Sequence, residues 1–130
     1  MKKLFILFLL FYLIIFSCED TNLTGSENVS EIENVTFSNL STSISNNTLI
    51  ASGTISNNNQ SLSISPPWYI ECQYYYENTS GNIFLIGGES TLISNALPAG
   101  VSLGWTLEHQ VDNPDNYSNF TVNDLRAYKN

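Results

Sequence analysis

His109 is the only histidine in the chain, and it limits the catalytic chemistry that the sequence can support. A Ser–His–acid triad needs the imidazole beside a nucleophilic serine and an orienting carboxylate. Glu108 is next in sequence, but neighbours on a strand point to opposite faces, and we expect His109 to be exposed at a strand end. A zinc site needs three or four Cys, His or carboxylate ligands. The sequence therefore predicts no catalytic residue, no metal ligand and no cofactor.

Carboxylates are the second kind of chemical candidate. Glu71 and Glu77 fall on one face of an expected strand, but about 20 Å apart at 3.3 Å per residue. The two carboxylates of a glycosidase lie roughly 5–10 Å apart. Residues 112–116 (DNPDN) offer the oxygen ligands that Ca²⁺ prefers. Pro114 falls at a ligand position, so a plain turn is the preferred interpretation, and a surface calcium site is the alternative.

Aromatic side chains are the third kind, as candidates for binding. Tyr69 and Tyr75 fall on the polar face of an alternating run, where exposed rings can stack on sugars or contact protein partners. Trp105 is the third candidate for ligand binding, although the alternation of its own segment favours the core. The alternative for all three rings is burial, through a second layer or a shifted register. Cys72 falls on the inward face and is expected to be a buried, unpaired thiol.

The elements that would position these residues are short strands. From Val35 onward, apolar runs alternate with clusters of Asn, Ser, Gly and Pro, which is typical of an all-β chain. The clearest strand is 68–77, with Trp68 and four further residues inward: Ile70, Cys72, Tyr74 and Tyr76. We expect bulges at residues 87–88 and 123–124. Six to eight strands in under 100 residues predict a two-sheet sandwich with both tryptophans in its core.

The N-terminus has the composition of an export signal. Lys2 and Lys3 precede an unbroken apolar run over 4–16, which is shorter than the roughly 20 residues of a membrane span. Residues 19–34 are polar and acidic, and we expect a flexible tether. All twelve acidic residues follow position 18. The chain from residue 18 onward has only two basic residues, Arg126 and Lys129, so its net charge is about −10. Such a charge disfavours binding to nucleic acid.

The residues Ile15, Phe16, Ser17 and Cys18 resemble the lipobox of bacterial lipoproteins. The resemblance implies a signal peptide over 1–17, in part a signal helix, removed before Cys18. It also implies diacylglycerol on the Cys18 thiol and anchoring to a membrane. Glu19 and Asp20 are similar to the short acidic signals that direct some lipoproteins to the cell surface. We therefore expect location in the cell envelope, on the outer membrane and facing outward.

Four short segments of the remaining chain resemble the FxLYD-type domains of exported bacterial proteins. They are 53–57 (GTISN), 70–77 with Gly81 after the turn, 97–100 (LPAG) before 101–107, and 120–122 (FTV). The similarity spans about 48–128 and implies an immunoglobulin-like two-sheet β-sandwich of about seven strands. With the tether at 18–34, this places the sandwich domain at 35–130. The family has no shared catalytic site, so the resemblance implies no activity.

Two functions are expected from these observations. The first is a non-enzymatic accessory or protein-binding module, held on the membrane through Cys18 and contacting another envelope protein. The alternative is a module that binds a small ligand or carbohydrate through Tyr69, Tyr75 or Trp105.

Overall fold

The computed structural model describes residues 29–130. The expected signal peptide, lipid anchor Cys18 and most of the expected tether lie outside these residues. The described chain contains strands and one short 3₁₀ helix: β1 (Ser30–Glu31), β2 (Val35–Ser45), β3 (Thr48–Asn57), β4 (Trp68–Glu77), β5 (Ile83–Ile93), β6 (Ser102–Gln110), η1 (Pro114–Tyr117) and β7 (Thr121–Lys129). Within this part of the chain, no helix is long and apolar enough to span a membrane.

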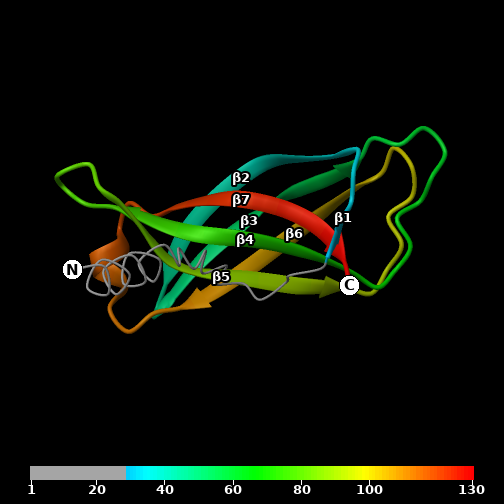
Figure 1. Cartoon of the computed structure of the whole chain (residues 1–130). Coiled ribbons are helices and arrows are strands. Elements are labelled where there is room, and N and C mark those ends of the chain that lie inside the picture. The colour runs from blue at the N-terminus through cyan, green and yellow to red at the C-terminus, as the bar shows by residue number, and fades with distance from the viewer. Residues whose placement is uncertain (1–28) are drawn as a thin grey trace, which may run out of the picture.

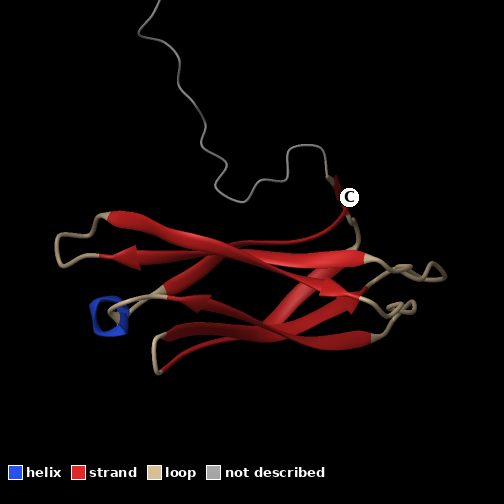
Figure 2. Cartoon of the chain, turned by 90° about the horizontal axis from the view of Figure 1, so that it is seen from below, coloured by secondary structure: helices blue, strands red, loops and turns tan. Residues whose placement is uncertain are grey.

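The strands form a sandwich of two antiparallel sheets. One sheet has the order β1-β7-β4-β5, and the other has the order β2-β3-β6. Figure 1 names the strands, and Figure 2 shows the two layers from the side. The predicted all-β sandwich of about seven strands is confirmed.

β4 supplies the centre of the core, as its alternating pattern predicts. Trp68, Ile70, Cys72 and Tyr74 are each fully buried. Their outward neighbours are shielded to differing degrees by side chains of the adjacent strands. Cys72 is a free, buried thiol, as predicted. Burial raises its pKa to about 12, because the thiolate loses its hydration in the apolar interior.

Trp105 of β6 is buried, with 5% of its surface exposed, so its expected ligand-binding role as an exposed ring is wrong and its expected core position is confirmed. Gly53 of β3 is the physical reason. A Cβ atom at Gly53 would lie 2.9 Å from Cζ2 of Trp105. The missing side chain lets the indole cross β3 and pack edge-on against Phe37 of β2, with ring centroids 6.1 Å apart.

Two bulges adjust the register of the first sheet. The pairing of β4 with β5 shifts between Tyr74 and Tyr75, close to the expected bulge at 87–88, and β5 continues as one strand through it. The pairing of β4 with β7 shifts between Glu71 and Gln73. Asp124 lies at this second bulge with φ of 53°, so the predicted bulge at 123–124 is confirmed.

The sandwich begins earlier than the expected boundary at residue 35. Ser30 and Glu31 pair with Lys129 and Tyr128, inside the segment expected to be tether. The backbone N–H of Ile32 also donates to the carbonyl of Ala127 at 2.8 Å, and the Ile32 side chain packs partly buried against the core. One apolar side chain and a few ladder bonds therefore attach this segment to β7, although its composition is polar.

The two ends of the sandwich differ in their loops. The Asn57 end consists of loops 58–67 and 94–101, which are joined by the bridge between Ile64 and Leu97. The hairpin end consists of the β4–β5 turn over 78–82 and the segment 111–120 that contains η1. Figure 1 shows these ends on the right and the left of the molecule.

Candidate functional site

The outer surface of the four-stranded sheet carries a continuous group of polar and aromatic side chains. Tyr69 of β4 stacks on Tyr128 of β7, with ring centroids 5.1 Å apart and planes inclined by 12°. The guanidinium carbon of Arg126 lies 5.3 Å from the Tyr128 ring centroid, a cation–π arrangement. We call this group the polar–aromatic face: Tyr69, Glu71, Gln73 and Tyr75 of β4 with Asp124, Arg126 and Tyr128 of β7.

Glu71 lies at the centre of this face and is only 2% exposed. Its Oε1 accepts hydrogen bonds from Nη2 of Arg126 at 2.8 Å and from Nε at 3.2 Å. An unpaired buried carboxylate would be costly, so the pair with Arg126 is what allows Glu71 to be buried here. Glu71 therefore joins β4 to β7 at the centre of the face, and its place on the polar side of the strand does not leave it exposed.

Tyr75 closes the other end of the face. Its hydroxyl donates to Oδ2 of Asp124 at 2.6 Å and lies 2.5 Å from Oε1 of Gln73. The hydrogen bond to the Asp124 carboxylate raises the pKa of Tyr75 to about 12, because the carboxylate stabilises the protonated phenol. Tyr69 and Tyr75 are thus on one face, as predicted, but each is half-buried and already engaged by a neighbouring side chain.

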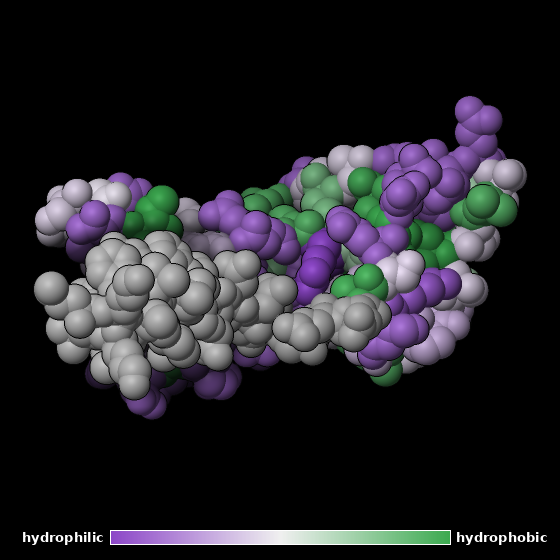
Figure 3. Space-filling view, viewed as in Figure 1, coloured by the Kyte–Doolittle hydropathy of each residue, from purple (hydrophilic) through white to green (hydrophobic). Residues whose placement is uncertain are grey.

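A second candidate surface is the lateral opening between β2 and β7. β1 pairs only with Tyr128 and Lys129, so the outer edge of β7 from Thr121 to Leu125 has no strand partner among residues 29–130. Beside this edge, Leu40 and Ile44 of β2 are 46% and 38% exposed. We call the open edge of β7 and the exposed apolar side chains of β2 together the β2–β7 slot; the two strands are in contact, and Phe37 of β2 and Leu125 of β7 pack partly buried against the core. Figure 3 shows apolar surface between polar side chains where β2 and β7 adjoin.

The sequence predicts that His109 is exposed at a strand end, and this prediction is wrong. It is half-buried and points between the sheets, where its ring stacks on Tyr74 with centroids 5.3 Å apart. Its Nδ1 lies 2.8 Å from Oε1 of Glu89. Gly87 of β5 provides the space, because a Cβ atom there would lie 2.4 Å from Cε1 of the ring. Because Gly87 has no side chain, the imidazole fits into the space between the sheets.

The hairpin end holds an open hollow of about 670 Å³, which we call the hairpin hollow. Tyr76 of β4 and Tyr117 of η1 meet in it edge to face, with ring centroids 5.7 Å apart. The remaining lining residues are polar: Glu77, Asn78, Thr79, Asp115, Asn116, Ser118 and Asn119. A second hollow of about 330 Å³ beside it shares Asn116 and Tyr117 and reaches His109.

Part of the expected calcium loop forms η1, which Pro114 opens and which the segment 112–113 precedes. Proline is suited to the first helical turn, because it has no N–H to satisfy there. Among residues 29–130, no three His, Cys, Asp or Glu side chains lie together as a metal site would require.

Sequence reasoning did not identify the hairpin hollow or the β2–β7 slot. The alternating pattern predicts Tyr76 on the inward face, but the side chain is only half-buried and lies in the hairpin hollow, edge to face with Tyr117. Leu40 and Ile44 gave a signal, since they are apolar residues in a run otherwise rich in serine and threonine. The sequence alone does not show that these apolar residues lie on a strand next to β7, because that depends on the order of the strands in the sheets.

Comparison with models of known protein families, with curated proteins and with solved structures gives no match for this chain.

Proposed function

We propose that this protein is an envelope lipoprotein, anchored through lipid on Cys18, whose sandwich is a non-enzymatic module that binds an extended segment of another envelope protein. The anchor is supported by Lys2 and Lys3, the apolar run 4–16 and the lipobox-like residues ending in Cys18. The single observation that carries the binding role is that the β7 edge from Thr121 to Leu125 has no strand partner within residues 29–130 and adjoins β2, which has exposed apolar side chains.

An edge strand binds a partner by adding one more strand to the sheet. The backbone groups of β7 then hydrogen-bond to the partner, while alternate partner side chains occupy neighbouring apolar surface. In this protein the edge from Thr121 to Leu125 supplies the backbone groups. The β2–β7 slot supplies the apolar surface, because Leu40 and Ile44 lie beside the edge and are exposed. The two requirements of strand addition are therefore met side by side.

The charge of the protein selects the partner. Asp124 lies on the open edge, Glu31 ends β1, and Glu33 follows two residues later. The whole chain has a net charge of −8, so a second copy would bring like charge to this surface. The fitting partner is an extended segment that alternates apolar and basic residues.

The test uses two synthetic peptides of about ten residues, one alternating valine with lysine and one alternating valine with glutamate. We expect the basic peptide to bind the lipidated protein in detergent micelles and to slow hydrogen exchange of the β7 amides. The double variant Leu40→Glu, Ile44→Glu should weaken this binding by about tenfold or more. The matched control is Leu92→Glu, an exposed leucine on β5, which should leave binding unchanged.

Equal binding of both peptides, or loss of binding in the Leu92→Glu control alone, would remove the β7 edge from the proposal. Protection of β5 or β2 amides in place of β7 amides would have the same consequence.

Anchoring and location are tested separately. Radiolabelled palmitate should enter the wild-type chain and not Cys18→Ala, and label in that variant would end the lipoprotein proposal. Protease added to intact cells should remove the domain if Glu19 and Asp20 direct it to the outer surface. Survival of the domain until the outer membrane is opened would place it in the periplasm.

A glycan platform built from Tyr69 and Tyr75 has less support than the β7 edge. The Tyr69 ring is stacked on Tyr128, and the Tyr75 hydroxyl is bonded to Asp124, so both would give up existing contacts to bind a sugar.

A further inference from the structure

The hairpin hollow has walls that are fixed before any ligand arrives. On one side, Oδ1 of Asn78 accepts hydrogen bonds from the backbone N–H groups of Ser80 and Asn82, each at 2.9 Å. On the other side, the N–H of Phe120 donates to the carbonyl of Tyr117 at 3.0 Å and closes the segment after η1. A preformed site binds with a smaller loss of conformational entropy than a mobile one.

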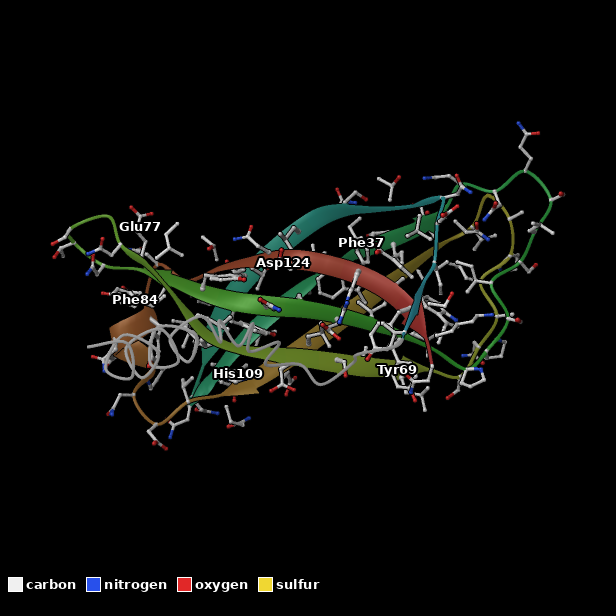
Figure 4. All side chains as sticks on the ribbon, viewed as in Figure 1. Phe37, Tyr69, Glu77, Phe84, His109 and Asp124 are labelled. Carbon is white, nitrogen blue, oxygen red and sulfur yellow. The ribbon has the colours of Figure 1, made fainter. Side chains whose placement is uncertain are left out.

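Aromatic groups gather at this end of the molecule. Tyr76 and Tyr117 pack edge to face inside the hollow. Phe84 of β5 is the cross-strand partner of Tyr76 and is 52% exposed. Figure 4 labels Phe84 and Glu77 at this end, beside η1. An exposed ring beside a half-buried pair offers an apolar surface that the C–H face of a sugar ring can cover.

The polar lining selects the class of ligand. Amides of Asn116 and Asn119 and the Ser118 hydroxyl can both donate and accept hydrogen bonds, as a polyhydroxylated ligand requires. The charged groups of the lining are Glu77 and Asp115, both negative, and the described lining includes no Lys, Arg or His. Phosphates and uronic acids would meet like charge here, whereas a neutral sugar would not.

The size of the site suggests more than one sugar ring. The hollow of about 670 Å³ falls within the usual range of ligand sites, about 300–1,000 Å³. The second hollow shares Asn116 and Tyr117 and extends the lining toward His109. We propose that the hairpin hollow binds a neutral oligosaccharide, with the rings of Tyr76 and Tyr117 inside the hollow against the sugar faces and the Asn116 and Asn119 amides on the hydroxyls. Phe84 does not line the hollow, but it pairs with Tyr76 across the strands and extends the apolar surface beyond the rim.

This site is distinct from the β7 edge and can bind independently of it. Isothermal titration calorimetry of the lipidated protein, in a detergent without a sugar headgroup, tests a panel of maltohexaose, cellohexaose, mannohexaose and hexagalacturonate. We expect at least one neutral hexasaccharide to bind and hexagalacturonate not to bind. Phe84→Ala should weaken the binding by about tenfold. Leu92→Ala, the removal of an equally exposed apolar group from the same strand, should leave it unchanged.

Three results would overturn the proposal. One is no heat of binding with any of the neutral sugars. Another is equal loss in Phe84→Ala and Leu92→Ala. The third is a hollow that binds Ca²⁺ while the wild type and Phe84→Ala have the same affinity for sugar. Sugar binding that persists in the presence of EGTA and depends on Phe84 supports the proposal, whatever the fate of peptide binding at β7.

Discussion

The two ends of the sandwich differ in whether side-chain hydrogen bonds join their loops to one another. At the Asn57 end, a buried amide ties two loops together: Nδ2 of Asn57 donates to the carbonyls of Leu62 and Leu97, each at 2.9 Å. At the hairpin end, the corresponding amide of Asn78 satisfies only its own turn, and the space between the hairpin and η1 stays open. Loops of the protein fill the Asn57 end, whereas the hairpin end keeps an open hollow of the size of a ligand site.

This difference separates residues that stabilise the fold from residues that are available for function. Asn57 is fully buried, and its backbone also bonds to Val101 and Gly100. Local stability in proteins is uneven, and binding elements come from the less stable regions. We therefore expect substitutions at the Asn57 end to lower the free energy of unfolding, and substitutions at the hairpin end to act mainly on binding.

The largest effect is expected for Trp68→Ala. Trp68 is fully buried at the Asn57 end, and its Nε1 donates to the carbonyl of Asn95 at 3.0 Å. Removing such a side chain from a core costs about 3–5 kcal/mol. Chemical denaturation monitored by circular dichroism measures the loss. A midpoint equal to that of the wild type would show that this end is not tightly packed.

Asn57→Ala should come next, with a loss of about 1–3 kcal/mol. The substitution removes the donors to Leu62 and Leu97 and the acceptor for the Asn59 backbone N–H at 3.1 Å. Hydrogen exchange should then accelerate at Ile64 and Leu97, whose bridge joins the two loops. Unchanged exchange at both amides would mean that the bridge, and not Asn57, ties the loops.

Gly87→Ala should lower stability by about 1–3 kcal/mol through overpacking. The new methyl group would collide with the His109 ring, which then has to leave Tyr74 and the Glu89 carboxylate. The chemical shift of the His109 ring protons reports the displacement. The double variant Gly87→Ala, His109→Ala should regain part of the lost stability, and no recovery would place the strain elsewhere in β5.

Alkaline pH should destabilise the fold through Cys72, which lies between the two ends. Its pKa is raised from 9.0 to about 12 by burial, so the unfolded chain loses this proton before the folded protein does. Stability is therefore complete below pH 9 and falls as the pH rises toward 12, by about 1 kcal/mol at pH 10. Cys72→Ala should have a flatter pH profile above pH 9 than the wild type. Parallel profiles would assign the alkaline loss to other groups.

The sequence predicts the core better than the surfaces, and the reason is physical. Period-two alternation places Trp68, Cys72 and Tyr74 correctly, because one buried face fixes the register of the strand. The bulge at Asp124 was also predictable, since Asn and Asp tolerate positive φ. Pattern within a strand carries this information without knowledge of its neighbours.

Which side chains lie side by side depends on strand order, and no pattern within one strand contains it. His109 turns inward because Gly87 of another strand leaves space, and Glu71 is buried because Arg126 lies across from it. The open edge of β7 likewise follows from the shortness of β1. The candidate sites are therefore products of the topology, and of the aromatic residues on the polar–aromatic face the sequence indicates only Tyr69 and Tyr75 as candidates for binding.

The smallest effect on stability is expected for Asn78→Ala. Comparison of this variant with Asn57→Ala tests whether one end of the sandwich serves stability and the other serves binding. The Asn78 side chain accepts two hydrogen bonds, from the backbone N–H groups of Ser80 and Asn82, and both of these donor residues are exposed. Water replaces these bonds when the amide is removed, so the loss should be about 0.5–1 kcal/mol. Sugar affinity should fall several-fold, because the turn that forms one wall of the hairpin hollow loosens. Calorimetry on Asn57→Ala and Asn78→Ala in parallel measures both quantities. If Asn78→Ala loses as much stability as Asn57→Ala while its sugar affinity is unchanged, the hairpin end is a structural clamp like the other end, and the distinction between a filled and an open end fails.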